Sequence, residues 1–281
     1  MERYSIIRDK MPREFVLLQG TGCRWRRCEF CDYHLDVSDD PFEVNRQVLE
    51  QVTGEYGVLD VINSGSAFEL DDRTIELLRR IIVEKKIHTL WCEMHWMYRN
   101  RLEEFGEQIT HFARDFYSAR HNEQALSALA NRKNIQITDC SECEMDSFLT
   151  PHFIAKGSKT FGSSFLTIKF RCGVETFDGA LRKRWNKGVP EGVTAEEVAR
   201  YFQGVCLLCC TEGETRERIV RDIELARKHF EYFSVNVFCN NTTKIKRDQA
   251  LVDWFVSEVY PTIKDDPRIE VLIDNTDLGV G

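Results

Sequence analysis

The sequence predicts an α/β fold, a partial (β/α)6 barrel of the TIM type built from parallel strands. Two observations predict it. Short apolar runs alternate along the chain with segments of helical periodicity, and residues able to do chemistry come directly after several of those runs. Repeated strand–helix–strand order implies parallel pairing through right-handed crossovers, in a sheet that is either open and doubly wound or curved into a barrel. In such a barrel the functional residues lie at the carboxyl ends of the strands.

The strands and helices follow from these patterns. Seven apolar runs are expected to form strands, at residues 15–19, 58–62, 88–92, 166–172, 205–210, 233–238 and 269–273. Four helical patterns lie between them, at residues 71–86, from 194 onward, at 215–230 and at 248–260. In the first of these helices Ile75, Leu78 and Ile82 recur at the spacing of one helix face. Cys206, Cys209 and Cys210, inside the fifth run, are expected to be packing residues, since free cysteine is usually buried.

Segment 101–164 interrupts the alternation. A crossover needs only about a dozen residues, and this connection is several times longer, with a poor helical pattern over most of its length. We therefore expect one domain, residues 1–281, that contains an insertion of uncertain order at 101–164. The insertion holds a thiol pair, Cys140 and Cys143, whose metal binding the sequence leaves open.

Composition limits the class of protein. The chain has 281 residues, of which 42% are hydrophobic and 30% charged, as is usual for a globular protein. No apolar run approaches the roughly 20 residues of a membrane span, and the first residues lack the apolar core of a signal peptide. A cytoplasmic protein without a membrane partner is expected. The net charge of −8 argues against a broad nucleic-acid surface, which would need many Lys and Arg residues.

Three cysteines directly after the first apolar run carry the chemistry. Cys23, Cys28 and Cys31 have the spacing C-x4-C-x2-C. Three thiolates can hold a 4Fe-4S cluster and leave one iron open to a small molecule. The same spacing occurs in 2Fe-2S proteins, which require a fourth cysteine, and the next one here is Cys92. Zinc is a third alternative, because His34 would complete a set of three thiolates and one imidazole.

With this motif the chain resembles the radical SAM superfamily, whose usual spacing is C-x3-C-x2-C with an aromatic residue before the last cysteine. Phe30 matches that aromatic residue, while the first gap is one residue longer. The resemblance implies a 4Fe-4S cluster on Cys23, Cys28 and Cys31 that reductively cleaves S-adenosylmethionine to a 5′-deoxyadenosyl radical. That radical would abstract hydrogen from an unknown substrate.

The resemblance also implies partners. An external one-electron reductant such as a ferredoxin or flavodoxin would reduce the cluster. The acidic balance favours a small molecule or a peptide over nucleic acid as substrate. A different class of function stays open at this point: a non-catalytic metal-binding protein, with zinc or an iron–sulfur cluster, that serves electron transfer or structure.

The turn after the second apolar run is a second candidate site. Radical SAM proteins bind the methionine amino group of the cofactor with a Gly-rich turn at this place. Ser64, Gly65 and Ser66 occupy it here. Small residues suit a turn whose backbone makes the contacts.

Further candidates resemble the coproporphyrinogen-oxidase-like group of the superfamily. Glu93 follows the third run, where that group has an acidic residue on the ribose hydroxyls of the cofactor. Glu175 and Lys187 lie in segments similar to the Gly-Val-Gln and Asn-Arg/Lys pieces of the group. The resemblance implies that Glu175 contacts the cofactor and that Lys187 binds its carboxylate. Four residues near the third run are candidate substrate neighbours: Trp91, His95, Trp96 and Tyr98.

Overall fold

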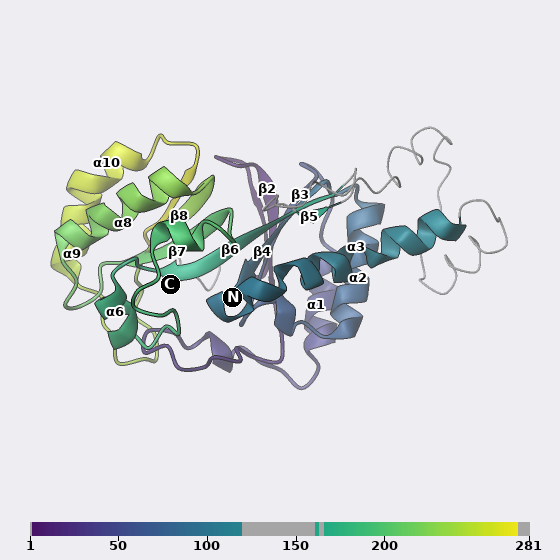
Figure 1. Ribbon diagram of the computed structural model, residues 1–281, viewed down its shortest axis with the longest axis horizontal. Helices are drawn as coiled ribbons and strands as arrows, with labels where there is room; N and C mark the ends of the chain where they lie inside the picture. Colours follow the sequence, from purple (N-terminus) through teal and green to yellow (C-terminus); the bar gives the residue numbers. More distant parts are fainter. Residues whose placement is uncertain (1, 120–160, 163–165, 275–281) are drawn as a thin grey trace.

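A single curved sheet organises the chain, in a computed structural model that describes residues 2–119, 161–162 and 166–274 (Figure 1). Seven strands run parallel in the order β2-β3-β4-β6-β7-β8-β9. Strands β1 and β5 pair antiparallel with β2 and β6. Helices cover the outside of the sheet, so the expected partial barrel of parallel strands is confirmed.

All seven expected strands are present, with ends that differ by a few residues. The strands are β1 Tyr4–Ile7, β2 Arg13–Leu18, β3 Val58–Asn63, β4 Thr89–Met94, β5 Phe161–Gly162, β6 Thr167–Glu175, β7 Gly204–Cys209, β8 Tyr232–Val237 and β9 Ile269–Leu272. Strand β4 continues two residues beyond the expected end, because Glu93 and Met94 still pair with β6. Strand β1, which no pattern predicted, is a half-buried edge strand of four residues.

Helices link the strands and lie in two groups in Figure 1, α1 to α3 beside the early strands and α8 to α10 beside the late ones. The helices are α1 Pro41–Leu49, α2 Asp72–Glu84, α3 Leu102–Ala119, α6 Gly179–Arg184, α7 Ala195–Val198, α8 Arg216–His229, α9 Gln249–Trp254 and α10 Tyr260–Ile263. Short turns are η1 Tyr33–Leu35, η2 Ala67–Glu69, η3 Trp96–Arg101 and the π-turn η4 Phe255–Val259. Thr194 caps α7 by accepting from the Glu197 N–H, as the capping box predicts.

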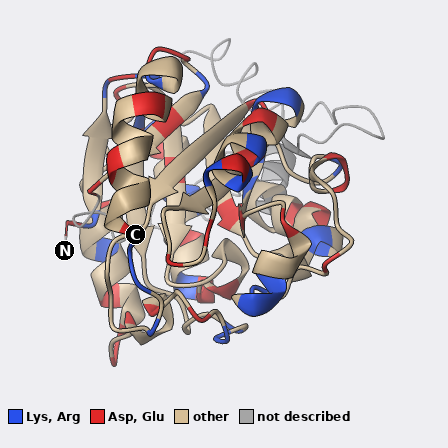
Figure 2. Cartoon of the chain, turned by 90° about the vertical axis from the view of Figure 1, so that its left-hand side faces the viewer, with Lys and Arg blue, Asp and Glu red and all other residues tan. Residues whose placement is uncertain are grey.

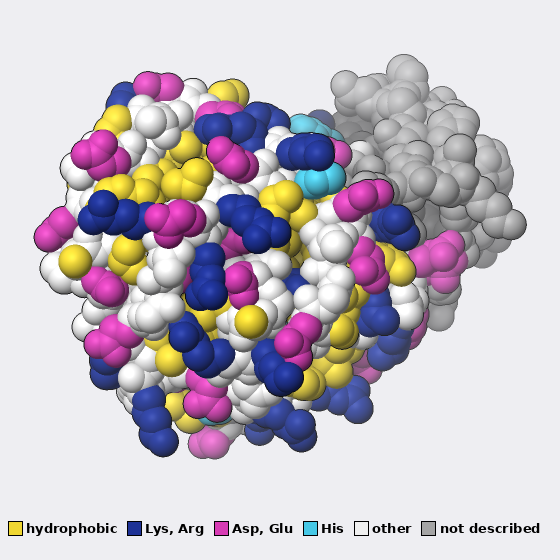
Figure 3. Space-filling model, turned by 60° about the vertical axis from the view of Figure 1, so that its left-hand side comes forward, with side chains coloured by type: hydrophobic (Ala, Val, Ile, Leu, Met, Phe, Trp, Pro, Cys, Tyr) yellow, Lys and Arg dark blue, Asp and Glu magenta, His cyan; other side chains and the backbone are white. Residues whose placement is uncertain are grey.

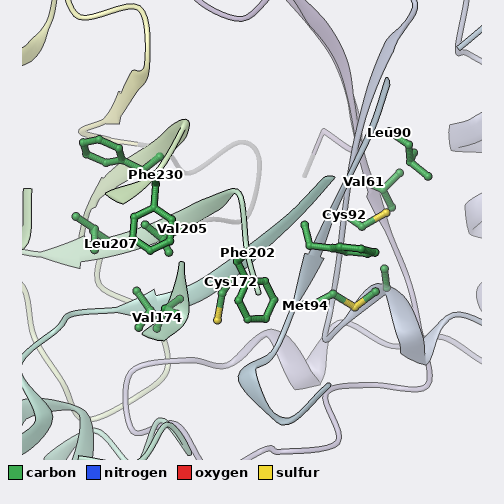
Figure 4. Close-up of a cluster of buried hydrophobic side chains, with 14 of the residues drawn as sticks. Val61, Leu90, Cys92, Met94, Cys172, Val174, Phe202, Val205, Leu207 and Phe230 are labelled. Atoms are coloured by element: carbon green, nitrogen blue, oxygen red, sulfur yellow. The ribbon is translucent and has the colours of Figure 1, made fainter. Parts of the chain in front are cut away.

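Alternate strand residues face opposite sides of the sheet, which separates the core from the site. The outward residues pack against the helices, and Figure 4 draws part of this core, including Cys92, Cys172 and Val205. Cys209 and Cys210 belong to the same core, as expected of packing residues. Cys206 does not belong to it, because its position on β7 faces the interior of the barrel.

A network of buried charges fills the barrel at the amino-terminal ends of the strands. Asp60 on β3 accepts from Arg13 Nε at 2.9 Å and from Arg171 at 3.0 and 3.1 Å. Arg13 also binds both carboxylate oxygens of Glu270 on β9. Asp60 is fully buried and both arginines are nearly so. Strands from both edges of the parallel sheet are thereby tied together, and the opposite end of the barrel is left for a site.

The expected insertion, 101–164, begins with an ordered helix. Leu102, Phe105 and Ile109 of α3 are buried in the main core. Residues 120–160, which include Cys140 and Cys143, lie outside the described residues, so the expectation for that part stays a prediction.

The surface mixes charges of both signs. Lys and Arg are interspersed with Asp and Glu over the helices in Figure 2, and the face in Figure 3 also alternates charged and hydrophobic side chains. Among the described residues, no helix combines the length and the apolar character that a membrane crossing requires.

Candidate active site

A cavity opens at the carboxyl ends of the parallel strands. Nine of the ten residues predicted as site residues line it: Cys23, Cys28, Phe30, Cys31, Ser64, Gly65, Glu93, Glu175 and Lys187. They come from segments far apart in the sequence. Ser66, the tenth, is fully buried behind the cavity wall, where its Oγ accepts from the His95 N–H at 2.9 Å.

The three cysteines lie in one loop, residues 19–31, here called the cysteine loop. Its far end is fixed to the opposite side of the barrel: the Glu29 N–H donates to the Trp185 carbonyl at 2.9 Å, and Asn241 Nδ2 donates to the Phe30 carbonyl at 2.7 Å. Phe30 packs edge-on against Trp185, with ring centroids 5.4 Å apart. The aromatic residue of the motif thus anchors the loop.

The chemistry of the donors suits a cluster bound by thiolates. Cys23, Cys28 and Cys31 are free thiols. Burial raises the pKa of Cys28 to about 11 and that of Cys31 to about 12, so both carry protons at neutral pH in the metal-free protein. Metal binding would release those protons. Lys187, whose charge lies close enough to lower both values somewhat, offers a cation beside the resulting thiolates.

The zinc alternative depends on a fourth ligand beside the three cysteines. In the described parts of the chain no three His, Cys, Asp or Glu side chains are grouped closely enough to hold one ion. His34, the candidate fourth zinc ligand, lies in η1 and is not among the residues that line the cavity. The three cysteines all line one cavity, as the thiolate ligands of a single cluster must.

A carboxylate that the sequence analysis did not single out joins the cysteine loop to the turn after β3. Glu69 accepts from the Arg24 N–H at 3.1 Å, the Ser66 N–H at 3.0 Å and the Tyr98 hydroxyl at 2.8 Å. It is 9% exposed. Three hydrogen bonds to one buried carboxylate fix the loop beside the turn. Only the Ser66–Glu69 pair has a local signal, a capping box.

Gly65 in the turn lies directly against the backbone of the cysteine loop. A Cβ atom on Gly65 would lie 2.9 Å from the Cα of Cys23 and would collide with a carboxylate oxygen of Glu69. Only glycine fits between them. The turn therefore presents bare backbone to the cavity beside the first cysteine.

Three charged side chains meet above Gly173 on β6. Lys187 Nζ lies 2.7 Å from Glu175 Oε1. A Cβ atom on Gly173 would be 3.0 Å from Glu175 Oε1, 3.3 Å from Glu93 Oε1 and 3.4 Å from Lys187 Nζ. Burial works against the charge of Lys187, but the Glu175 carboxylate together with the nearby Cys28 and Cys31 raises the pKa of the lysine well above its usual value. Burial raises the pKa of Glu93. The site thus holds a protonated Lys187 beside the carboxyl groups of Glu175 and Glu93.

The backbone around Lys187 is held by two aromatic rings. Trp25 of the cysteine loop donates from Nε1 to the Asn186 carbonyl at 2.7 Å and stacks on His95 at 5.6 Å. His95 Nε2 lies 2.9 Å from the Lys187 carbonyl. Burial lowers the pKa of His95 to about 4, so the neutral ring donates to that carbonyl at neutral pH. Gly188 has φ +78°, and a Cβ there would meet the Trp25 ring at 2.5 Å.

Of the four aromatic candidates for substrate contact, only His95 lines the cavity. Trp96 lies in the main core, and Tyr98 is buried behind the turn on Phe68. Trp91 faces the barrel interior below the cavity, beside Tyr232.

The whole chain is similar to a solved enzyme. It shares 34% identity with a queuine lyase from Clostridium spiroforme bound to SAM and queuine, with a TM-score of 0.72, and the match covers 100% of this chain and 99% of that one. A weaker likeness, 15% identity and TM-score 0.46, covers 92% of this chain and 49% of Streptococcus suis SuiB bound to S-adenosylmethionine. Comparison with protein-family models and with curated proteins gives no match.

Proposed function

This chain belongs to the radical SAM superfamily, and from that premise we propose that it is a lyase that cleaves queuine or a closely related deazaguanine base. The observation that carries the proposal is the 34% identity to a queuine lyase over the full length of both chains. The cavity supports it, because one space brings together the three cysteines and the charged residues expected around the cofactor.

Cys23, Cys28 and Cys31 are proposed to hold a 4Fe-4S cluster. When bound and reduced, the cluster with S-adenosylmethionine supplies a 5′-deoxyadenosyl radical able to take a hydrogen atom from an unactivated carbon. The chain provides the thiolates, and the positive charge of Lys187 lies close enough to stabilise those of Cys28 and Cys31. Phe30 and its contact with Trp185 keep the last two cysteines in place.

The remaining predicted site residues are proposed to bind S-adenosylmethionine. Ser64 and Gly65 offer backbone groups next to Cys23, where the methionine end would lie. Lys187, kept charged by Glu175, is suited to the methionine carboxylate. Glu93 can accept hydrogen bonds from ribose hydroxyls. The grouping with coproporphyrinogen-oxidase-like enzymes rests on these motifs alone and stays a prediction.

The inner part of the cavity suits a polar base. Queuine is a deazaguanine whose aminomethyl nitrogen carries a cyclopentenediol, so it presents several N–H donors. Asn63 and Asn236 line the cavity, 7% and 3% exposed, and the side-chain oxygen of each has no hydrogen-bond partner among the described residues. Buried acceptors without partners are costly unless a ligand or water satisfies them. A ligand rich in N–H groups would satisfy both.

We propose further that a ferredoxin or flavodoxin supplies the electron and that the protein works in the cytoplasm. A small molecule is favoured over a peptide or nucleic acid as substrate, since the chain is similar to an enzyme with queuine bound.

Anaerobic turnover tests the proposal. The purified protein, reconstituted with iron and sulfide, is incubated with S-adenosylmethionine, dithionite and queuine, and the products are separated by mass spectrometry. We expect queuine to be consumed with formation of 5′-deoxyadenosine, and both to fall at least a hundredfold in Cys28→Ala. The matched control is Cys172→Ala, a buried thiol of the core.

Two outcomes would contradict the proposal in different ways. Formation of 5′-deoxyadenosine that queuine does not stimulate would reject the substrate and keep the enzyme class. A colourless protein with one bound zinc, or a cluster indifferent to S-adenosylmethionine, would instead identify a non-catalytic metal-binding protein.

A further inference from the structure

A thiol that is not a cluster ligand lies in the wall of the same cavity. Cys206 is the third residue of β7 and faces the barrel interior, 5% exposed. Cys209, three residues later, faces the helices and belongs to the hydrophobic core. The inward thiol shares its cavity with Cys23, Cys28 and Cys31, which come from the opposite end of the sequence.

The surroundings of Cys206 keep it a thiol. Its Sγ lies 3.8 Å from Glu93 Oε2. Burial and the nearby Glu93 carboxylate raise the pKa of Cys206 well above its usual value, although Arg171 lowers it somewhat. A protonated thiol is a poor metal ligand and a poor nucleophile. It is, however, a good donor of hydrogen atoms, because an S–H bond is weaker than most C–H, N–H and O–H bonds.

A second feature of this wall points to a bound ligand. Asn236 on the neighbouring strand β8 pairs in register with Leu208, two residues beyond Cys206 on β7. Asn236 lines the cavity, and its Oδ1 is buried without a hydrogen-bond partner among the described residues. An N–H donor bound to Asn236 would lie on the same inner wall as the Cys206 thiol. The wall therefore combines a recognition group with a hydrogen-atom donor.

We propose that Cys206 donates the hydrogen atom that ends the radical reaction. The inference rests on the proposed lyase function. Once a hydrogen atom has been removed from the substrate, the carbon–nitrogen bond one atom away from the radical centre breaks homolytically. A double bond forms in one fragment, and the unpaired electron stays on the other.

Hydrogen transfer then closes the fragment. The S–H bond of Cys206 breaks, the fragment gains the hydrogen atom and becomes a closed-shell product, and Cys206 is oxidised to a thiyl radical. One electron from the ferredoxin- or flavodoxin-type donor, with one proton from solvent, reduces the thiyl back to the thiol. The substrate loses one hydrogen atom and regains one, so its cleavage is redox-neutral.

Near-isosteric replacement tests the inference. Cys206→Ser keeps the size and polarity of the side chain but replaces S–H with the much stronger O–H bond. In anaerobic turnover with queuine, we expect Cys206→Ser and Cys206→Ala to form 5′-deoxyadenosine within threefold of the wild-type rate. The amount of fragment released per 5′-deoxyadenosine falls at least tenfold, and an organic radical accumulates in freeze-quenched samples examined by electron paramagnetic resonance. Cys209→Ala is the matched control and keeps the wild-type ratio.

The contrary results are distinct. Wild-type product ratios in Cys206→Ser would show that size and polarity suffice, which overturns the inference. Lost affinity for queuine in that variant, measured by calorimetry with S-adenosylmethionine but without reductant, would also overturn it, since Cys206 would then shape the cavity. Absence of queuine-dependent 5′-deoxyadenosine in the wild type would instead reject the proposed function.

Discussion

Gly65 has no room for a side chain beside the cysteine loop. A methyl group there would meet both the backbone of Cys23 and the Glu69 carboxylate. We predict that Gly65→Ala destabilises the fold by about 1–3 kcal/mol, as overpacking does, and displaces the cysteine loop from the turn. Iron content after reconstitution would then fall severalfold, as measured by metal analysis together with chemical denaturation.

Gly192 gives the matched control, because a Cβ atom there meets nothing within 4 Å. Gly192→Ala should retain wild-type iron content and stability. Full iron loading of Gly65→Ala would contradict the role assigned to the close approach.

Some site residues can be predicted from the sequence around them, and others depend on contacts with distant segments. The three cysteines could be predicted because their spacing within one loop is itself the signal. Glu175 and Lys187 were predicted from resemblance, and they form an ion pair with each other in the cavity. Glu69 and Cys206 were not predicted as site residues, because their roles depend on contacts with segments about 45 and 113 residues away. For Cys206 a signal did exist: it shares strand parity with the inward-facing Gly204 and Leu208.

At the scale of elements, helix α8 is tied to the carboxyl end of β6 by one buried carboxylate. Asp222 accepts from Thr176 Oγ1 at 2.5 Å and from the Phe177 N–H at 2.9 Å. Burial raises the pKa of Asp222 to about 6, although these hydrogen bonds lower it. The native state therefore binds the proton more tightly than the unfolded chain, in which the pKa of an Asp is about 4.

This difference in pKa makes the stability of the fold depend on pH. Stability falls as the pH rises from about 4 to about 6, where only the unfolded chain has released the proton, by at most about 3 kcal/mol. Asp222→Asn should flatten this part of the curve, measured by urea denaturation at stepped pH. Glu212→Gln, at an exposed position, is the control and should leave the curve unchanged. An unchanged slope in Asp222→Asn would contradict the assignment.

The elements themselves were predictable where periodicity was strong. Helix α2 ends within two residues of its expected bounds, and Asp71 caps it by accepting from the Thr74 N–H. Helices α1 and α3 were not predicted. The first turn of α1 follows an acidic, polar stretch. Helix α3 lies at the start of a connection whose length indicated an insertion, although Leu102, Phe105 and Ile109 carry helical spacing.

At the scale of the whole molecule, Asp60 links strands of the barrel at their amino-terminal ends, on the side away from the cavity. It lies between Arg13 and Arg171, both nearly buried. Asp60→Asn would leave two buried cations without their shared counter-charge. We predict a loss of about 3–5 kcal/mol in the free energy of unfolding, measured with urea.

An exposed ion pair of similar length serves as the control. Lys183 and Glu191 lie 2.7 Å apart on the surface. Because solvent screens such pairs, Lys183→Ala should cause no measurable change. A similarly small effect of Asp60→Asn would show that the network does not stabilise the barrel.

Parallel pairing was predictable from alternation, since parallel neighbours follow from strand–helix–strand repeats. The charged network below the cavity was not predictable, because Arg13 and Glu270 are 257 residues apart. Nothing in the sequence around either residue indicates that it is buried and paired. Inward side chains meet when they lie at the same level along the barrel axis. That level depends on the register between strands, which a single sequence does not determine.

The proposed function requires that Cys23, Cys28 and Cys31 hold a cluster with one iron open to S-adenosylmethionine. Electron paramagnetic resonance of the reduced, reconstituted protein at low temperature tests it most directly. We predict a 4Fe-4S signal whose g-values shift when S-adenosylmethionine is added, and no such signal in Cys28→Ala. A reduced-cluster spectrum that stays identical after S-adenosylmethionine is added would contradict the claim.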